Sequence, residues 1–449
     1  MQIRLPDKVN KIIGILTKAG YEAYAVGGCV RDSILGKEPN DWDITTSATP
    51  EETKRLFGRT IDTGIKHGTV TVMLDREGFE VTTYRIDGDY EDGRHPKEVT
   101  FTASLEEDLR RRDFTINAMA YNEQCGLVDI FDGVRDIEQK IIRCVGNAEE
   151  RFTEDALRMM RAVRFSAQLG YRIDEGTKSA IRRLAPNLKL ISAERIQAEL
   201  VKLVMSPHPD YLRIAYETGI TEQILPEFDV CMQTAQNNPH HCYSVGEHIL
   251  HAMLEIDADK VLRLGMLFHD IGKPKTLTVD EEGITHNKGH AVVGEKLTRK
   301  ILNRLKFDND TIDKVTKIVL YHDQEITPTD SGVRRAINRI GDRIFPMLFP
   351  VRRADIYAQS DYHRGEKLNR LAYIQEIYDG ILQRQECLNL QDLAVTGNDL
   401  MALGIPAGKE IGVLLKELLE IVLEEPERNT KEELLLISRE RIRTNSLNS

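Results

Sequence analysis

Asp41-Trp42-Asp43-Ile44 is the stretch of this sequence that decides the fold. Side chains at positions i and i+2 of a strand project from the same face, so Asp41 and Asp43 would share one face while Trp42 and Ile44 point into the core. Two carboxylates on one face can hold a pair of divalent cations. The stretch therefore predicts a strand that binds Mg²⁺ together with a triphosphate.

A glycine pair, Gly27-Gly28, stands before this strand and directly after the run 23–26. Residues 30–35 have a helical pattern, so the glycines would form a turn at the N-terminus of a helix. Backbone N–H groups at such a turn can face phosphate oxygens. The order strand, glycine turn, helix, acidic strand predicts a nucleotide-binding module.

Two later blocks add polar groups that suit a nucleotide. Asp113 and Asn117 are four residues apart and would share a face if residues 111–120 are helical. Asp155 and Arg158 are three apart in a helical pattern, which puts an acceptor and a forked donor on one side. Such a pair suits the Watson–Crick edge of a base. The alternative for Asp155 and Arg158 is an ordinary ion pair within the helix.

With residues 63–69 and 194–196, these blocks resemble the class II tRNA nucleotidyltransferases, which comprise the CCA-adding enzymes and their bacterial poly(A) polymerase relatives. The resemblance implies a DNA polymerase β-like head in which Asp41 and Asp43 bind catalytic Mg²⁺. It also implies that protein side chains, in place of a nucleic-acid template, select CTP or ATP. The residues expected at the nucleotide are Gly27, Gly28, Arg31, Arg111, Arg112, Asp113, Asn117, Asp155, Arg158, Arg161 and Arg164.

The expected chemistry is attack of a 3′-hydroxyl on the α-phosphate of a nucleoside triphosphate. One Mg²⁺ would lower the pKa of the hydroxyl, and the other would stabilise the leaving pyrophosphate. Arg31, Arg111 and Arg112 are the cations expected near the triphosphate. Asp113 and Glu80 are the two candidates for a third acidic ligand of the metal ions.

A second group of metal-binding residue types lies downstream. His269-Asp270 follows an apolar stretch, His248 and Asp355 are further candidate ligands, and His290 and His322 would complete a two-metal site. This group resembles the HD-domain metal phosphohydrolases, with Mg²⁺, Mn²⁺, Ni²⁺ or Fe as the metal. The resemblance implies a phosphatase or phosphodiesterase acting on a 2′-nucleotide or a 2′,3′-cyclic phosphate. An inert scaffold that holds tRNA is the alternative. Other histidines, expected to be ordinary polar residues, include His240, His241, His251 and His286.

The composition is that of a chain able to bury several cores, with 41% hydrophobic residues among 449. It contains no apolar run of about twenty residues and no signal-peptide pattern, so we expect a cytoplasmic protein without a membrane span. The six scattered cysteines indicate reduced thiols. Because the net charge is −11, RNA binding requires a local basic stripe, and Arg158, Arg161 and Arg164 on one helix are candidates.

The expected fold class is α+β, with a small mixed sheet in the head followed by helical regions. A capping box at Thr49 predicts a helix, and residues 69–74 and 79–84 predict a hairpin. The polar segment 87–96 predicts a mobile loop beside the active site, which in the resembled family is typical of enzymes that add the terminal A. The expected domains are a catalytic head at 1–143, a nucleotide-selecting and RNA-binding neck at 144–225, an HD domain at 226–360 and tRNA-binding helices at 361–449.

Three functions remain open. We favour a transferase that adds CCA, or part of it, to the tRNA 3′ end from CTP and ATP, with contacts to the acceptor stem. An A-adding enzyme or a poly(A) polymerase would use the same head, and a non-catalytic RNA-binding protein is the alternative from another class. The intact Asp41 and Asp43 argue against that last alternative, and residues 63–69 favour the CCA-adding branch. The oligomeric state is not indicated.

Overall fold

The computed structural model describes residues 2–87 and 99–447. Its contacts divide the chain into two compact units. The first runs to Asp229 and includes Arg304–Phe307, and the second consists of Val230–Asn303 and the chain from Asp308 onward. The predicted division into four domains is finer than this one and stays a prediction. The predicted loop at 87–96 falls almost entirely outside the described residues.

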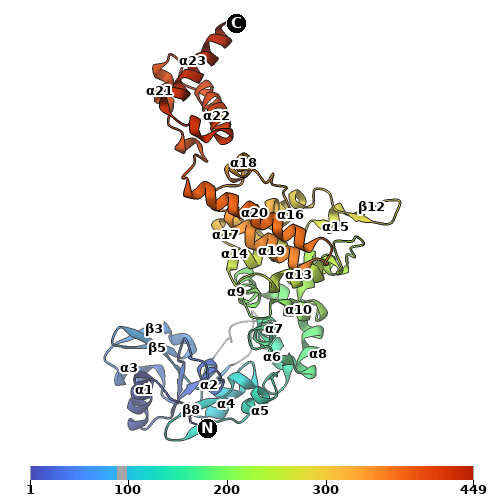
Figure 1. Cartoon of the computed structure of the whole chain (residues 1–449). Helices are drawn as coiled ribbons and strands as arrows, with labels where there is room; N and C mark the ends of the chain where they lie inside the picture. Colours follow the sequence, from blue (N-terminus) through green and yellow to red (C-terminus); the bar gives the residue numbers. More distant parts are fainter. Residues whose placement is uncertain (1, 88–98, 448–449) are drawn as a thin grey trace. The chain divides into compact units, whose positions relative to one another are not determined.

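The first unit is built on a mixed sheet with the strand order β3-β4-β5-β2-β1-β8-β9 (Figure 1). β2 and β5 are parallel, and the other neighbouring strands are antiparallel. The predicted α+β class with a small mixed sheet is thereby confirmed. The strands are β1 (Ala23–Val26), β2 (Ile44–Thr46), β3 (Thr60–Gly64), β4 (Thr69–Leu74), β5 (Glu77–Thr83), β8 (Ala120–Asn122) and β9 (Gly126–Val128).

Local sequence explains the elements that flank the metal-binding stretch. Helix α3 (Pro50–Leu56) begins at the predicted capping box, in which the Thr49 hydroxyl accepts from the Glu52 amide and Glu52 accepts from the Thr49 amide. The predicted hairpin is β4 and β5, and its turn consists of Asp75 and Arg76, with φ angles of 49° and 69°. Positive φ at both central residues matches the right-handed twist of the strands.

Helices pack on this sheet and continue the chain into an all-α region. Helix α1 (Asp7–Lys18) packs on β1 and β2, and α3 packs on β4. Two small pairs lie outside the main sheet: β6 (Arg85–Asp87) with β7 (Val99–Phe101), and β10 (Ile141–Ile142) with β11 (Arg172–Ile173). The other helices of this part are α2 (Gly28–Ile34), α4 (Leu105–Arg110), α5 (Gly133–Glu138), α6 (Ala148–Glu154), α7 (Leu157–Leu169), α8 (Glu175–Leu184), α9 (Ala193–Val204), α10 (Leu212–Glu217), α11 (Ile220–Ile224) and α12 (Pro226–Gln233).

The second unit is almost entirely helical. Helices α13 and α14 pack on each other and on α19, while α20 packs on α18 and α19 (Figure 1). Its short hairpin pairs β12 (Thr278–Val279) with β13 (Thr285–His286). The helices are α13 (Val245–Leu254), α14 (Lys260–Phe268), α15 (Lys273–Thr276), α16 (His290–Arg304), α17 (Asn309–Tyr321), α18 (Asp330–Ile340), α19 (Leu348–Ala358), α20 (Arg364–Gln383), α21 (Gly397–Ala402), α22 (Lys409–Glu424) and α23 (Lys431–Leu447).

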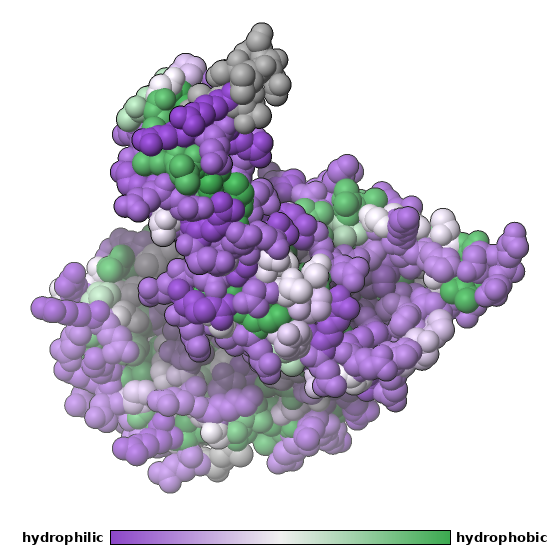
Figure 2. Space-filling model, turned by 45° about the horizontal axis from the view of Figure 1, so that its top comes forward, coloured by the Kyte–Doolittle hydropathy of each residue, from purple (hydrophilic) through white to green (hydrophobic). Residues whose placement is uncertain are grey.

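The last helices, α21 to α23, surround an apolar cluster of their own that includes Leu400, Leu418 and Val422. Among the described residues, no helix is both long and apolar enough to cross a membrane. The face seen in Figure 2 is mostly hydrophilic, with small separate apolar patches. The hydrophobic residues are thus used mainly in the cores of the two units.

Candidate functional sites

The two acidic residues of the deciding stretch lie at the entrance to β2. The strand predicted to contain Asp41 and Asp43 begins only at Ile44, so both acidic residues precede it. The carbonyl of Asp43 still accepts from the Val26 amide at 3.0 Å. Asp41 and Asp43 are exposed and Ile44 is fully buried, as predicted. Trp42 differs from the prediction. It is half-buried and lines a shallow surface cavity near the N-terminus, so it does not enter the sheet core.

A third carboxylate, Glu80, belongs beside this pair. β2 and β5 run parallel, and Ile44 pairs with Val81. Asp43 and Glu80 each stand one residue before this pair, at equivalent positions of the two neighbouring segments. Burial raises the pKa of Glu80, and the charges of Asp43 and Asp41 raise it further. Burial likewise raises the pKa of Asp43, against the opposing effect of Arg112. Neighbouring carboxylates whose negative charges oppose one another form an arrangement that a divalent cation would stabilise.

Asp113, the other candidate for a third ligand, is already neutralised. It is 8% exposed, and its Oδ2 receives Arg161 Nε at 2.8 Å while its Oδ1 receives the Asn117 amide nitrogen at 3.2 Å. Burial raises the pKa of Asp113, but Arg161 outweighs that effect and lowers the pKa to about 2. The condition that residues 111–120 form a helix is not met, since a 3₁₀ turn at Thr115–Asn117 leads into β8. The turn still brings Asp113 and Asn117 together.

The glycine turn lies between the acidic residues and this block. Gly27 has a φ of 85°, and its N–H donates to the Met119 carbonyl at 3.1 Å. A Cβ at Gly27 would come within 2.9 Å of Arg112 Nη1, so only glycine allows Arg112 this approach. The helix predicted over residues 30–35 is α2, which begins two residues earlier, at Gly28, and ends at Ile34.

The three arginines expected at the triphosphate are held by partners within the head. Arg31 is 9% exposed and donates to Asn117 Oδ1 at 2.7 Å. Arg111 pairs with the fully buried Asp108 at 2.7 Å, and Arg112 lies 3.7 Å from the same carboxylate. Burial lowers the pKa of Arg112, whereas Asp108, Asp43 and Asp113 raise it. Arg112 is therefore a cation that lies close both to Gly27 and to the acidic residues Asp43 and Asp108.

The predicted pairing of Asp155 and Arg158 on one helix is not observed. Helix α6 ends at Glu154, Asp155 has extended angles, and α7 begins at Leu157. Asp155 instead pairs with Arg195 at 2.6 Å, and Arg158 pairs with Glu154 at 2.5 Å. The alternative of an ion pair between Asp155 and Arg158 is replaced by these two separate pairs, and their role in reading a base stays a prediction. The contribution of Arg195 was missed, although the stretch 194–196 was noted.

Helix α7 carries the arginines of the predicted basic stripe, and each has an acidic partner. Arg161 pairs with Asp113 at 2.6 Å, and Arg164 pairs with Glu199 at 2.5 Å. Arg164 is 6% exposed and its guanidinium lies 3.9 Å from the centre of the Phe165 ring. Burial lowers the pKa of Arg164, an effect that Glu199 opposes. The stripe is therefore a network of ion pairs that is buried at Arg164, where a charge at such depth needs a partner.

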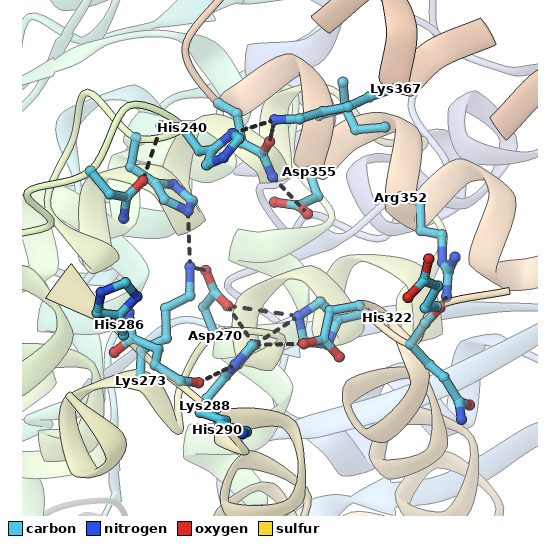
Figure 3. Close-up of a pocket in the computed structure, with 18 of the residues that line it drawn as sticks. His240, Asp270, Lys273, His286, Lys288, His290, His322, Arg352, Asp355 and Lys367 are labelled. Atoms are coloured by element: carbon cyan, nitrogen blue, oxygen red, sulfur yellow. Dashed lines mark hydrogen bonds and ion pairs between the residues drawn. The ribbon is translucent and has the colours of Figure 1, made fainter. Parts of the chain in front are cut away.

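Four histidines, His248, His269, His290 and His322, converge on Asp270 in the second unit. Asp270, His290 and His322 are labelled in Figure 3. The Nε2 atoms of His248 and His269 are 3.1 Å apart, and those of His290 and His322 are 3.3 Å apart. Asp270 lies between the pairs: its Oδ2 is 3.3 Å from His269 Nε2, and its Oδ1 is 3.4 Å from His290 Nε2. One carboxylate thus faces two groups of histidine nitrogens, as in a bridging ligand.

The other ring nitrogen of each histidine lies near a backbone carbonyl. This contact sets the tautomer with hydrogen on Nδ1 and leaves the Nε2 lone pair for a metal ion. Among the described residues, potential ligand atoms lie within 4.8 Å of one another in just two groups, and both are here. The Nδ1 contacts are His248 with Ala358 at 3.3 Å, His269 with Met266 at 2.7 Å, His290 with Asn287 at 2.9 Å and His322 with Val319 at 2.8 Å.

Asp355 completes the predicted set, with its Oδ1 2.9 Å from His248 Nε2. Burial lowers the pKa of His269, but Asp270 and Asp355 outweigh it and raise that pKa to about 10. The pKa values of both carboxylates are well below their usual range despite burial, because the histidines stabilise their charges. Lys273, which the sequence analysis did not single out, pairs with Asp270 at 2.7 Å.

A cavity of about 910 Å³ opens beside these residues (Figure 3). Asp270, His290, His322 and Asp355 are on its wall, so the candidate ligands are accessible from it. Histidines expected to be ordinary polar residues also line it. Its cationic and histidine wall includes His240, His241, Lys273, His286, Lys288, Arg352, Lys367 and Arg370.

Comparison with known families gives three matches along the chain. The poly A polymerase head domain matches residues 23–143, and a probable RNA and SrmB-binding site of polymerase A matches residues 170–232. A domain described as tRNA nucleotidyltransferase domain 2 matches residues 289–437. The first match covers the sheet and the acidic residues, and the other two cover helical regions.

CCA-adding enzymes are among the similar curated proteins. The enzyme of Leuconostoc mesenteroides is 55% identical over 225 residues, which are 49% of this chain and 55% of that protein. The enzyme of Lactiplantibacillus plantarum is 57% identical over 198 residues, which are 44% of this chain and 49% of that protein. The chain spans about half the length of the curated relatives that it matches.

Solved structures match the whole chain. The crystal structure of the Bacillus stearothermophilus CCA-adding enzyme in complex with CTP has a TM-score of 0.73 and 32% identity, covering 100% of both chains. The Thermotoga maritima CCA-adding enzyme complexed with tRNA has a TM-score of 0.57 at 20% identity, covering 98% of this chain and 100% of that one, which shows a shared fold.

The mixed sheet with its acidic residues and glycine turn defines a polymerase β-like nucleotidyltransferase head, followed here by helical regions. With a full-length match at 32% identity, the chain belongs to the family of the CCA-adding enzymes.

Proposed function

We propose that this protein is a tRNA nucleotidyltransferase that adds CCA to the tRNA 3′ end from CTP and ATP. The observation that carries the proposal is the placement of Asp43 and Glu80, each one residue before the paired Ile44 and Val81. Asp41 precedes Asp43 by two residues, and the Asp43 carbonyl accepts from the Val26 amide directly before the Gly27 turn. The relatives described as CCA-adding enzymes, one of them in complex with CTP, support the same reaction. A reaction on tRNA with nucleoside triphosphates belongs in the cytoplasm, which is part of the proposal.

Divalent cations fit the acidic residues of the head, since their charges already oppose one another. We assign Asp41 and Asp43 as the Mg²⁺ ligands, with Glu80 as the third carboxylate. Mg²⁺ held there would supply the charge that activates the 3′-hydroxyl and stabilises the leaving pyrophosphate. Arg112, between Asp43 and Gly27, would hold triphosphate oxygens next to these ligands.

Base selection is assigned to the start of α7. Asp155 supplies an acceptor and Arg158 a donor, and each is oriented by a fixed partner, Arg195 and Glu154 respectively. Arg158 also donates to the Arg111 carbonyl at 3.0 Å, which connects this helix to the block around Asp113. Fixed partners limit rotation of both groups, and such pre-organisation favours discrimination between cytosine and adenine edges.

Labelled CTP and ATP, offered singly and together to tRNAs that end before, within and after CCA, test this function. We expect CTP to extend the shortest tRNA by two residues, ATP to complete it, and a finished end to stay unchanged. Incorporation of A only onto tRNA ending in CC would identify an A-adding enzyme. Long A tails on unrelated RNA would identify a poly(A) polymerase, and binding without incorporation would leave an RNA-binding protein.

A second activity is favoured by the histidine group. We propose a metal-dependent phosphohydrolase in which His248, His269, Asp270 and Asp355 hold one ion and His290 and His322, with Asp270, hold another. The supporting observation is that the Nδ1 atom of each histidine lies near a backbone carbonyl, while the Nε2 atoms of the four rings gather around Asp270. Imidazole and carboxylate together suit Mn²⁺, Ni²⁺ or Fe, and also Mg²⁺. A metal bound here would polarise a phosphate ester and activate water.

Hydrolysis of 2′,3′-cyclic AMP and of 2′-AMP, assayed with each metal in turn, tests the phosphohydrolase. We expect turnover by the protein and none by Asp270→Asn, while Asp41→Ala retains it because Asp41 belongs to the other unit. Metal binding without turnover of either ester would favour a structural metal site that supports tRNA binding.

A further inference from the structure

A smaller cavity adjoins the histidine cavity, and nothing in the proposed reactions uses it. It has a volume of about 370 Å³, and its lining includes Tyr243, His251, Glu255, Tyr357 and Arg364. Gln359 lines both cavities, so they share a wall. A volume of this order is enough for one nucleoside, since small-ligand pockets start at about 300 Å³.

The helices that carry the candidate metal ligands also line the smaller cavity. On α13, His248 faces the metal group and His251 lines the smaller cavity. On α19, Asp355 faces the histidines and Tyr357 lines the smaller cavity. A molecule that occupied both cavities would therefore contact the same two helices, α13 and α19, in each of them.

The rings at the smaller cavity are exposed. Tyr243 is 37% exposed and Tyr357 is 44% exposed. Tyr243 stacks on His251, with ring centres 4.2 Å apart and planes at 19°, which holds the tyrosine ring in place. Exposed rings fixed in this way are platforms for nucleic-acid bases, and stacking of one base contributes about 1–3 kcal/mol.

The wall between the cavities carries a hydrogen-bonded chain that ends in a cation. Gln359 Nε2 donates to Asp355 Oδ2 at 3.1 Å, and Lys367 Nζ donates to Gln359 Oε1 at 2.6 Å. Lys367 also lies 3.1 Å from His240 Nδ1 (Figure 3). Lys367 is only half-buried, so its charge is available to a phosphodiester passing from one cavity to the other.

We propose that the two cavities together bind the 3′ end of an RNA strand, with its terminal phosphate at the histidine group and the preceding base between Tyr243 and Tyr357. This inference rests on the proposed phosphohydrolase and names its substrate class: an RNA end that carries a 2′,3′-cyclic phosphate, in preference to a free cyclic mononucleotide. Water forms a new P–O bond, one ribose P–O bond breaks, and the leaving ribose oxygen takes the proton that the water gives up.

A comparison of two substrates tests the inference. The full-length protein is assayed with 2′,3′-cyclic AMP and with a six-nucleotide RNA that ends in a 2′,3′-cyclic phosphate, and the ratio of their kcat/KM values is measured. We expect the RNA end to be preferred. The preference should fall about tenfold in the double variant Tyr243→Ala/Tyr357→Ala, since the stacking of one base is lost. The matched control is Tyr373→Ala, because Tyr373 is 54% exposed on α20 and lines neither cavity.

Binding without turnover gives a second readout. Fluorescence anisotropy of the same RNA with a 2′-phosphate end, measured in chelator, should show weaker binding by the double tyrosine variant than by Tyr373→Ala. If the RNA and the mononucleotide are hydrolysed equally, or if both variants bind RNA alike, the inference is overturned. If neither substrate is hydrolysed but the double variant still binds the RNA more weakly than Tyr373→Ala, the proposed phosphohydrolase fails and the RNA-end site stands.

Discussion

His248 and His269 face each other with their Nε2 atoms 3.1 Å apart, while both Nδ1 atoms are occupied by backbone carbonyls. Two neutral imidazoles in this tautomer would direct two lone pairs at each other. A cation between them removes the conflict, whether it is a metal ion or the proton that the raised pKa of His269 provides. The pair is therefore built for a positive charge at its centre, which is the physical basis of the proposed metal site.

The first prediction concerns metal retention. Asp270 faces both histidine pairs, so Asp270→Asn should lower affinity for Mn²⁺ by more than about 100-fold, a larger effect than the loss of an outer partner. The metal content after dialysis, measured by mass spectrometry, checks this. His286→Ala is the control, because His286 lines the cavity but pairs with Asp280 at 2.7 Å, away from the ligands. Equal metal content in both variants would argue against a role for Asp270.

The sequence pattern alone was sufficient to predict structural features that depend on local interactions. The capping box at Thr49 and the hairpin of β4 and β5 each depend on residues a few positions apart. His248 and Asp355 were also predicted as neighbours, but from a resemblance and not from spacing. Such groups come together only through helix packing, which a linear pattern does not contain.

The errors have a common cause in long-range pairing. Asp155 was expected to interact along its helix, yet the partner that fixes it is Arg195, which is 40 residues away. The position of Glu80 beside Asp43 depends on the parallel register of β2 and β5. The predicted loop at 87–96 falls largely outside the residues that the structure describes, so its role stays a prediction.

The second prediction tests Asp41, Asp43 and Glu80 as the Mg²⁺ ligands of the head. Asp41→Ala, Asp43→Ala and Glu80→Gln should each reduce nucleotide incorporation by at least about 100-fold, because each removes a charge that would hold Mg²⁺. Their thermal midpoints should change little, since all three side chains are exposed. Glu77→Gln, on the same strand and paired only with the exposed Lys8, is the control and should incorporate normally. Normal rates in Glu80→Gln would return the role to another acidic residue.

The third prediction is a pH dependence of stability that comes from Asp113. Its pKa is lowered to about 2, so its pairing with Arg161 contributes stability above the unfolded pKa and loses that contribution as the pH falls from about 4 to about 2. The difference corresponds to about 2 kcal/mol. Arg161→Met should lower the thermal midpoint at neutral pH and flatten its decline in acid. Arg183→Met, which breaks a pair with exposed Glu149, should do neither.

The fourth prediction concerns the attachment of α22. Arg334 is 4% exposed and donates to the carbonyl groups of Leu423 at 2.6 Å and Glu424 at 3.0 Å, while it pairs with Glu386 at 2.6 Å. Arg334→Ala leaves these groups without their donor, so we expect about 3–5 kcal/mol of local destabilisation. Hydrogen exchange at the C-terminal end of α22 should accelerate accordingly.

The neighbouring arginine provides the control for this helix. Arg335 is on the same turn of α18, but its side chain is 47% exposed and pairs with the exposed Glu424 at 2.8 Å. Arg335→Ala should change exchange by less than about 1 kcal/mol, because exposed ion pairs contribute little. Similar exchange in the two variants would show that α22 is held by its apolar cluster alone.

The fifth prediction tests whether Arg112 acts through the glycine turn. Gly27→Ala introduces two effects: strain at a φ of 85°, and a Cβ within 2.9 Å of Arg112 Nη1. Gly408→Ala introduces strain alone, since Gly408 also precedes a helix with a positive φ, 139°, and has no atom within 4 Å of the added Cβ. Both variants should lose about 1–3 kcal/mol of local stability. Only Gly27→Ala should also weaken CTP binding, by about tenfold, because Arg112 must move from its place beside Asp43. Equilibrium dialysis with labelled CTP measures this, and equal affinities in the two variants would mean that Arg112 does not contact the nucleotide.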